Sequence, residues 1–519
     1  MDLTSNLFLI FVIAAVSVYY LAPRDLRWVV LLAASCLYYA SFGLRASAFF
    51  LFTALMTHFC AVRMTDSSAG TGSSDNGSSD THSAQSIKKR YLITGLICQF
   101  ALLAYLKYAG FAVLNLNSLL SAHISVPQLL LPFGISYYTF QASAYLIDVS
   151  RGLVKAERNP LKTLLFLVFF PQLAQGPIGR FDRLSPQLFS GSVFQWHSLR
   201  TGAERIVWGL FKKMVVGDTA HVFRTAIFGD PETYAGAALF GTLFFSAELY
   251  ANFSGGVDIC IGIARLFGIT LDENFKRPYF AKTLSEFWQR WHITLGSWMK
   301  DYVFYPLART RAMTGLGGVV KKALPGHRLH RALPQGLCSV IVFTLVGLWH
   351  GADWGNIGWG FYNGLIICVS ELIQAAGKGK RTVSAKRERS GFGNALRIAR
   401  TFAIVNVSWY FTCADSVSHA LTMIRYSLTR FSPAAVLQIP AGRPGTGTAG
   451  TPFALFALAC GILLMLVYGI LGERAERDEE KPLPALPLAA SFVMYLLLLV
   501  SIPLLAPAGE QGAFIYSQF

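Results

Sequence analysis

The sequence has 519 residues, of which 53% are hydrophobic and 14% are charged. In a soluble domain about a quarter of the residues are charged. The low charged fraction of this chain therefore excludes a soluble domain and predicts an all-α polytopic membrane protein. The 45 Lys and Arg residues outnumber the 28 Asp and Glu residues, an excess typical of basic cytoplasmic loops.

Apolar stretches recur along the whole chain, and a membrane helix needs about 20 mostly apolar residues. Several stretches are shorter, which predicts tilted, broken or re-entrant helices and about 11–13 crossings in total. The first is interpreted as a membrane helix and not as a cleaved signal, because no basic residue precedes it. The stretches are residues 7–21, 28–42, 46–62, 91–108, 129–149, 163–173, 206–216, 237–249, 257–267, 337–350, 357–373, 397–411, 452–471 and 484–505.

Two polar segments are predicted to be cytoplasmic loops. The Gly- and Ser-rich segment 65–83 lies within a basic frame, 63–90, and is expected to be flexible. The second loop, 377–396, contains the strongest basic run. That run has no interleaved aromatic residues for base stacking, so we expect an anionic membrane surface beside it and no nucleic-acid partner.

The stretch "LVGLWHGADWG", residues 345–355, places a histidine in an apolar run. His350 follows Gln335 by fifteen residues, which is roughly 22 Å of helix against a core of about 30 Å. We therefore expect His350 inside the membrane, near a chain break at Gly351, with Trp354 and Trp359 as cavity walls. It is either a functional residue or a histidine that bonds a neighbouring helix.

A second anomaly is "SEFWQRWHITLGSWMKDYVFYPL", residues 285–307, which has helical periodicity throughout. Thr283 or Ser285, followed by Glu286, predicts the helix start. An interfacial amphipathic helix would explain the pattern. Alternatively, His292 and His350 form a base and an orienting partner around a reactive centre. The aromatic stripe comprises Trp288, Trp291, Leu295, Trp298, Tyr302 and Tyr305, and the adjacent face Gln289, His292, Gly296 and Met299.

A third cluster, in "ELYANFSGGVDICIG", contains four polar residues at helical spacing: Glu248, Asn252, Ser254 and Asp258. Gly255 and Gly256 are expected to bend the helix. The carboxylates are candidates for a proton relay, an ion-coupling group or a partner for a buried arginine. A structural polar network between helices is an equally good interpretation.

Other chemistries lack their motifs. The sequence contains no H-E-x-x-H, P-loop or G-x-S-x-G motif. The eight cysteines occur singly in apolar stretches, and the two histidines would need further ligands to hold zinc. We predict neither a metal site nor a bound cofactor.

The two histidine motifs together resemble the bacterial branch of the membrane-bound O-acyltransferase family. "LPFGISYYTFQASAYLIDVSRG", "FFPQLAQGPIGRFDRL", "ENFKRPYFAKTLSEFW" and the terminal "FIYSQF" are similar to further landmarks. That branch includes membrane proteins of alginate O-acetylation and of teichoic acid D-alanylation. The resemblance implies a helical bowl with a central tunnel in a single domain, 1–519. We assign a catalytic core region at 131–376 and C-terminal transmembrane helices at 397–519.

The resemblance also implies residue roles. His350 corresponds to the essential histidine and acts as a general base or proton relay, while His292 orients or polarises the reacting groups. Where related sequences read similarly to "YFDFSGYSDMAIG", this chain has Asn252 in place of Asp and Gly256 in place of Tyr, which leaves the acceptor open. The predicted tunnel-lining or substrate-binding residues are Trp288, Gln289, Trp291, Trp349, Asn252, Ser254, Asp258, Trp354 and Asn356.

The expected activity is transfer of an acetyl group from a cytoplasmic donor, acetyl-CoA, to an extracellular or cell-wall polysaccharide. The acceptor is reached directly or through an extracellular or periplasmic partner protein. The expected location is the bacterial inner or plasma membrane, among membrane lipids. One alternative is D-alanyl transfer from a carrier protein to teichoic acid. Another is a transporter or flippase with His292, Asp258 and Glu248 as proton sites, although no internal repeat supports it.

Overall fold

The computed structural model describes residues 1–69, 79–127, 129, 131–173, 175–377, 391–441, 447–477 and 487–507. Within these ranges the chain is helical and has no β-strand, which confirms the predicted all-α class. The chain divides into two compact units. The first unit comprises Met1–Val207 and Gly256–Asp272, and the second comprises Trp208–Gly255 and Glu273–Ile515.

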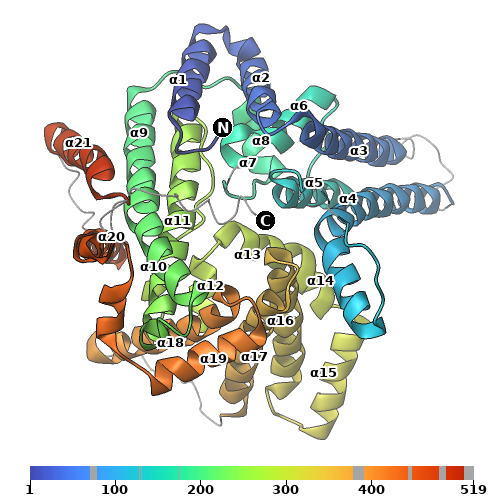
Figure 1. The fold of residues 1–519 in the computed structure, drawn as a ribbon. Coiled ribbons are helices and arrows are strands. Elements are labelled where there is room, and N and C mark those ends of the chain that lie inside the picture. The colour runs from blue at the N-terminus through green and yellow to red at the C-terminus, as the bar shows by residue number, and fades with distance from the viewer. Residues whose placement is uncertain are drawn as a thin grey trace. The chain divides into compact units, whose positions relative to one another are not determined.

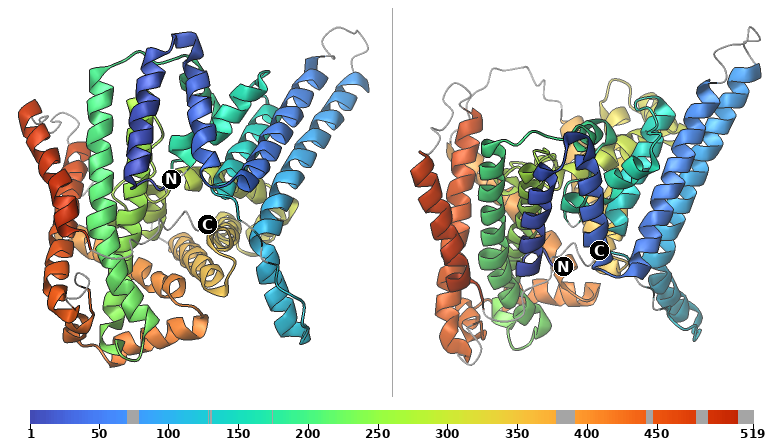
Figure 2. Two further views of the ribbon diagram at one scale, coloured as in Figure 1. Left: turned by 45° about the horizontal axis from the view of Figure 1, so that its top comes forward. Right: turned by 90° about the horizontal axis from the view of Figure 1, so that it is seen from above.

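The first unit is built around a long helical hairpin. Its antiparallel arms α3 and α4 lie side by side, and both contact α5 (Figures 1 and 2). The helices of this unit are α1 (Asn6–Leu21), α2 (Arg27–Ala40), α3 (Leu44–Ala69), α4 (Ser79–Leu120), α5 (Ile135–Arg151), α6 (Pro160–Val168), α7 (Phe170–Leu173), α8 (Phe181–Phe189) and most of α9 (Trp196–Phe211).

Helix α3 continues to Ala69 and α4 starts at Ser79. The described parts of the predicted loop, 63–69 and 79–90, are therefore helical, which corrects its extent. These parts contain no Gly or Pro to break a helix. Residues 70–78 lie outside the described ranges, as do 378–390 of the basic loop and the landmark at 514–519.

The second unit contains the remaining helices and shares α11 with the first. These are α10 (Asp218–Gly229), α11 (Ala238–Leu266), α12 (Leu284–Arg290), α13 (Ile293–Met299), α14 (Tyr305–Ala308), α15 (Arg311–Ala323), α16 (Leu329–His350), α17 (Trp354–Ala376), α18 (Gly391–Cys413), α19 (Val417–Thr429), α20 (Thr451–Arg477) and α21 (Leu488–Leu505). Two π-helical segments, Lys212–Gly217 and Lys300–Phe304, adjoin α10 and α14.

Among the residues that the structure describes, five helices are long and apolar enough to cross a membrane. This agrees with the multi-pass composition of the sequence, while the predicted total of about 11–13 crossings stays a prediction. The five candidate spans are Ser47–Ser67, Ala84–Leu120, Leu329–His350, Thr451–Ala475 and Leu488–Leu505.

Two predicted helices, 237–249 and 257–267, are a single helix, α11. Gly255 and Gly256 do not interrupt this helix, and Gly255 serves close packing. A Cβ there would lie 2.7 Å from the Gly209 carbonyl oxygen and 3.1 Å from the Lys213 amide nitrogen. Small residues let helix backbones approach in this way.

Glycines also allow the backbones of α16 and α17 to pack closely against each other. A Cβ at Gly360 would overlap the carbonyl oxygen of Phe343, and one at Gly364 would lie 2.7 Å from the Cα of Val340. The two helices form the most extensively packed pair of the second unit. Since His350 is the last residue of α16, this packing fixes its position.

Gly360→Ala is expected to lower the free energy of unfolding by about 1–3 kcal/mol, because the new methyl group forces the two backbones apart. The control is Gly358→Ala on the same helix, where the nearest atom, Phe411 Cδ1, would be 3.9 Å away. Thermal unfolding of both variants in lipid nanodiscs is the measurement. Equal stabilities would contradict the packing role of Gly360.

Candidate active site

His292 lies at a break between two short helices. Helix α12 begins as predicted, because Thr283 Oγ1 accepts a hydrogen bond from the Glu286 amide at 3.1 Å. The backbone is extended at Trp291 and left-handed at His292, with a φ of 46°, before α13 begins. The continuous helix predicted over 285–307 is therefore wrong.

A short extended segment, 274–276, pairs with this break. The Lys276 amide donates to the Arg290 carbonyl at 2.9 Å, and the Ile293 amide donates to the Asn274 carbonyl at 3.0 Å. These bonds satisfy backbone groups that a helix break would leave unpaired. The partners lie outside the periodic segment, so its periodicity could not reveal the break.

The Asn274 side chain fixes the orientation of His292. Its Oδ1 accepts from the Thr294 amide at 3.1 Å and from Thr294 Oγ1 at 2.9 Å, and it lies 3.2 Å from His292 Nδ1. The amide can only donate, so the Asn274 atom is the oxygen and His292 Nδ1 carries the proton. The neutral ring then keeps its lone pair on Nε2.

Burial also keeps His292 neutral. The residue lies outside the five candidate spans and is 3% exposed. Removal from water disfavours the charged imidazolium and lowers the pKa of His292 to about 3. At neutral pH, His292 is therefore a hydrogen-bond acceptor through Nε2.

His350 ends α16, and the predicted break follows it. Asp353 caps α17, accepting from the Asn356 amide at 2.7 Å. The Trp349 ring lies 4.8 Å from the His350 ring and 6.2 Å from the His292 ring, measured between centroids. Both histidine rings thus lie near one indole, and His350 is the more exposed of the two.

Aromatic rings enclose this pair. Trp359 lies 5.3 Å from His350 and 5.4 Å from Trp288, and Phe253 meets His292 edge-on at 4.9 Å. His292 is buried among these rings, and electrostatic interactions are stronger where water is excluded. Trp359 therefore lies beside His350, and its role as a cavity wall stays a prediction.

Some of the other predicted lining residues are buried and others are exposed. Trp291 and Trp349 are buried, and Asn356 bonds the carboxylate of Asp353 through its side chain. Trp354, by contrast, is 59% exposed, and Gln289 is also exposed. Trp354 is the first residue of α17, and its role as a cavity wall stays a prediction.

Two polar residues of α11 contact basic side chains of neighbouring segments. Ser254 accepts from Lys212 Nζ at 2.8 Å, while Glu248 pairs with Arg224 at 2.8 Å and with His221 at 2.7 Å. Glu248 is buried and pairs with Arg224, whose side chain is 21% exposed; these contacts between α10 and α11 match two predicted interpretations, a partner for an arginine and a structural polar network. The buried Asn252 packs against Gly217.

Asp258 belongs to the first unit, where it pairs with Arg205 at 2.9 Å. It therefore differs from the other predicted lining residues, which lie in the second unit.

Sequence reasoning missed Asn274, the residue that holds His292. The two are eighteen positions apart and share no periodic element, so no local pattern connects them. Lys212 and Arg224 were missed for the same reason. An apolar helix with several carboxylates does indicate that cations are buried nearby, but it does not identify them.

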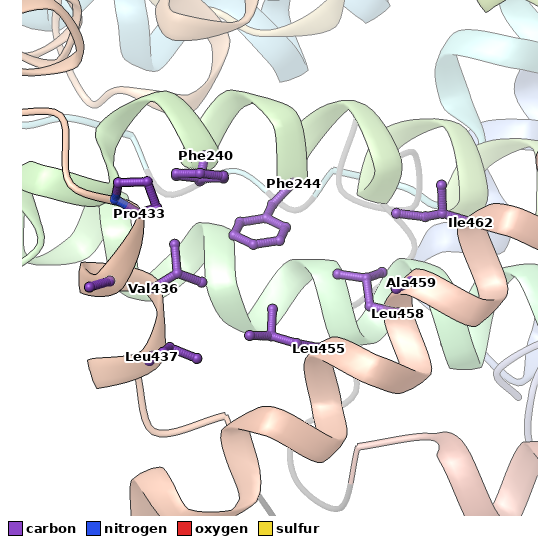
Figure 3. Close-up of a pocket in the computed structure, with 10 residues that line it drawn as sticks. Phe240, Phe244, Pro433, Val436, Leu437, Leu455, Leu458, Ala459 and Ile462 are labelled. Carbon is purple, nitrogen blue, oxygen red and sulfur yellow. The ribbon is translucent and has the colours of Figure 1, made fainter.

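The second unit also contains an apolar groove of about 510 Å³ between α11, α20 and the 3₁₀ segment Pro433–Gln438 (Figure 3). It contains none of the predicted site residues. Among the residues that the structure describes, no three His, Cys, Asp or Glu side chains are grouped as metal ligands.

Comparison with known proteins identifies relatives over most of the chain. The model of the MBOAT, membrane-bound O-acyltransferase family, matches residues 36–317. A probable alginate O-acetylase AlgI of Azotobacter vinelandii is 31% identical over 430 residues, covering 82% of this chain and 77% of the relative. A peptidoglycan O-acetyltransferase of Helicobacter pylori is 32% identical over 65% of this chain and 64% of the relative.

A teichoic acid D-alanyltransferase of Bacillus subtilis is similar over a shorter region, with 27% identity covering 55% of this chain and 69% of the relative. The match to the family model includes Asn274 and His292 and ends before His350.

Asn274→Ala is expected to lower the free energy of unfolding by about 1–3 kcal/mol, because buried donors of Thr294 and His292 lose their acceptor. The control is Asn117→Ala, which removes exposed bonds to the Ile124 backbone. Chemical denaturation in nanodiscs would measure both. A loss no larger than that of Asn117→Ala would show that Asn274 does not hold the break.

Proposed function

Since the chain belongs to the membrane-bound O-acyltransferase family and is an acyltransferase, we propose that it moves an acetyl group from a cytoplasmic donor to an extracellular or cell-wall polysaccharide. Support comes from the names of its relatives, which act on alginate and on peptidoglycan. The observation that carries the proposal is the pair of histidine rings that both lie near the Trp349 ring.

With acetyl-CoA as the donor, the reaction breaks a thioester bond and forms an oxygen ester. The acceptor hydroxyl forms a C–O bond with the acetyl carbon, and the C–S bond to the donor thiol breaks if acetyl-CoA is the donor. A base must remove the hydroxyl proton and return it to the leaving sulfur. We assign this role to His350, because it lies at a helix end and is the more accessible imidazole.

His292 orients the reacting groups in this proposal. Its Nε2 lone pair can accept a hydrogen bond from an O–H or N–H group of the bound substrates other than the reacting hydroxyl, while Asn274 prevents the ring from turning. We further propose a bacterial inner-membrane location and an extracellular partner that carries the acetyl group to the polymer. D-alanyl transfer is the second candidate, favoured by the similarity to the Bacillus subtilis D-alanyltransferase.

His350→Ala is expected to reduce ester-linked acetate on the surface polymer at least about 100-fold, the usual contribution of a general base. Acetate released by mild alkali would be compared between deletion strains that carry either form at equal membrane abundance. The control is His330→Ala, at the other end of α16, where the ring bonds the His327 carbonyl.

Full acetate in His350→Ala would remove the catalytic assignment. If the variant keeps acetate but loses ester-linked D-alanine, the activity is D-alanyl transfer.

Asn274→Asp tests whether the reaction needs neutral His292. A carboxylate at 3.2 Å from Nδ1 stabilises the imidazolium and raises the pKa of His292 from its low value. Protonation then removes the Nε2 lone pair, so transfer by the variant should fall as the pH is lowered from 8 to 5, relative to the unmodified protein. The pH profile of acetyl transfer measures this, and coincident profiles would exclude a role for the lone pair.

A further inference from the structure

A carboxylate of the C-terminal helix α20 contacts the segments that hold His292. Glu473 lies near the end of the candidate span Thr451–Ala475, and its side chain is 14% exposed. A charged side chain in a membrane helix is costly, so it is paired and usually marks a functional position. The proposed reaction assigns no step to Glu473, and its partners show what it can do for the candidate active site.

Glu473 binds two arginines through one oxygen atom. Its Oε1 accepts from Arg277 Nε at 3.0 Å and from Arg290 Nη1 at 2.5 Å. Both guanidinium groups are permanently charged, so two like charges lie side by side with this carboxylate between them. All three side chains are at most 20% exposed, and solvent screens such a repulsion only in part. Glu286 also pairs with Arg290, at 2.8 Å, but Glu473 is the carboxylate that bonds both arginines.

The two arginines belong to the two segments whose pairing forms the break at His292. Arg277 directly follows Lys276 in the extended segment, and Arg290 is the last residue of α12. The Lys276 amide donates to the Arg290 carbonyl at 2.9 Å, and Arg290 Nη1 donates to the Arg277 carbonyl at 3.4 Å. The carboxylate of α20 therefore bridges the end of this pairing, and Arg290 precedes His292 by only two positions.

Glycines of α20 make room for this contact. A Cβ at Gly472 would lie 2.7 Å from Arg277 Nη1, and one at Gly469 would lie 2.8 Å from Phe280 Cε2. Arg277 also has a left-handed backbone, with a φ of 47°, a conformation that a side chain adopts only when its surroundings hold it there. A close backbone approach and a constrained arginine distinguish this cluster from a solvent-exposed ion pair, which contributes little to structure.

We propose that Glu473 is a positioning residue for His292. By holding Arg277 and Arg290 together, Glu473 keeps the two segments at the break paired. Asn274 Oδ1 then stays beside His292 Nδ1, and the imidazole keeps its orientation and its tautomer. The C-terminal helix α20 is thereby part of the scaffold of the candidate active site and not a membrane anchor alone. The inference rests on the proposed function and adds a residue that supports the same site.

The test records nitrogen NMR spectra of the full-length protein, labelled with ¹⁵N-histidine, in lipid nanodiscs. His292→Gln identifies the His292 resonances by their loss. In the unmodified protein we expect one tautomer of His292, with the proton on Nδ1 and the lone pair on Nε2. In Glu473→Gln the two guanidinium groups repel each other and the pairing loosens, so both tautomers should appear. Acetyl transfer should fall at least about tenfold, because the ring is no longer held in one orientation.

The matched control for a loss of stability is Gly461→Ala on the same helix, whose Cβ would lie 2.5 Å from Val216 Cγ2. It should lower the unfolding temperature and leave the His292 resonances unchanged. If Glu473→Gln does not reach the membrane, Glu473→Asp replaces it. The carboxylate is then withdrawn by one methylene group, which weakens both bonds, and the second tautomer should still appear. A single tautomer in the Glu473 variant that is measured, or an equal change in Gly461→Ala, would overturn the proposal.

The tautomer of His292 is measured without any acyl transfer, so the two proposals can fail separately. If surface acetate depends on the protein but Glu473→Gln keeps one tautomer, the positioning role fails and the proposed function stands. If the second tautomer appears in Glu473→Gln but surface acetate does not depend on the protein, Glu473 still positions His292 and the acetyl-transfer proposal fails.

Discussion

The arrangement of the candidate site depends on one carboxamide oxygen. Asn274 Oδ1 meets the Thr294 amide, the Thr294 hydroxyl and His292 Nδ1. A helix break in a buried environment needs partners for its free backbone groups, and the segment that contains Asn274 supplies them. The same oxygen sets the tautomer of His292. Asn274 therefore stabilises the backbone at the helix break and also determines which ring nitrogen of His292 carries the proton.

This dependence explains which half of the site the sequence could predict. The break after His350 was predicted because Gly351 gives a local signal of a helix end, and α16 does end at His350. The break at His292 was missed because its causes lie eighteen residues away in sequence and because tryptophans continue the helical period across it. Local patterns report helix ends that are locally stabilised, and they miss those stabilised by tertiary bonds.

Helix α11 shows that a glycine in a helix can be interpreted in two ways, as a bend or as a site of close packing. Gly255 and Gly256 predicted a bend, yet the helix continues through both. Whether a glycine bends a helix or allows close packing depends on the backbone beside it, here the Gly209 carbonyl. The carboxylates were easier to interpret, since a charge in an apolar helix requires a partner. Glu248 has one in Arg224, although the sequence could not name it.

The two histidines differ in environment, and this difference supports separate roles for them. A general base works best when its pKa is near the working pH, whereas burial lowers the pKa of His292 to about 3. His292 is therefore a weak base, but it is a permanently neutral acceptor with a fixed ring. His350 is more exposed and ends a helix, so substrate can reach it more easily. The Trp349 ring lies near both imidazoles, at 4.8 Å from His350 and 6.2 Å from His292 between centroids. Assigning proton transfer to His350 and orientation to His292 is the division of labour that these environments favour.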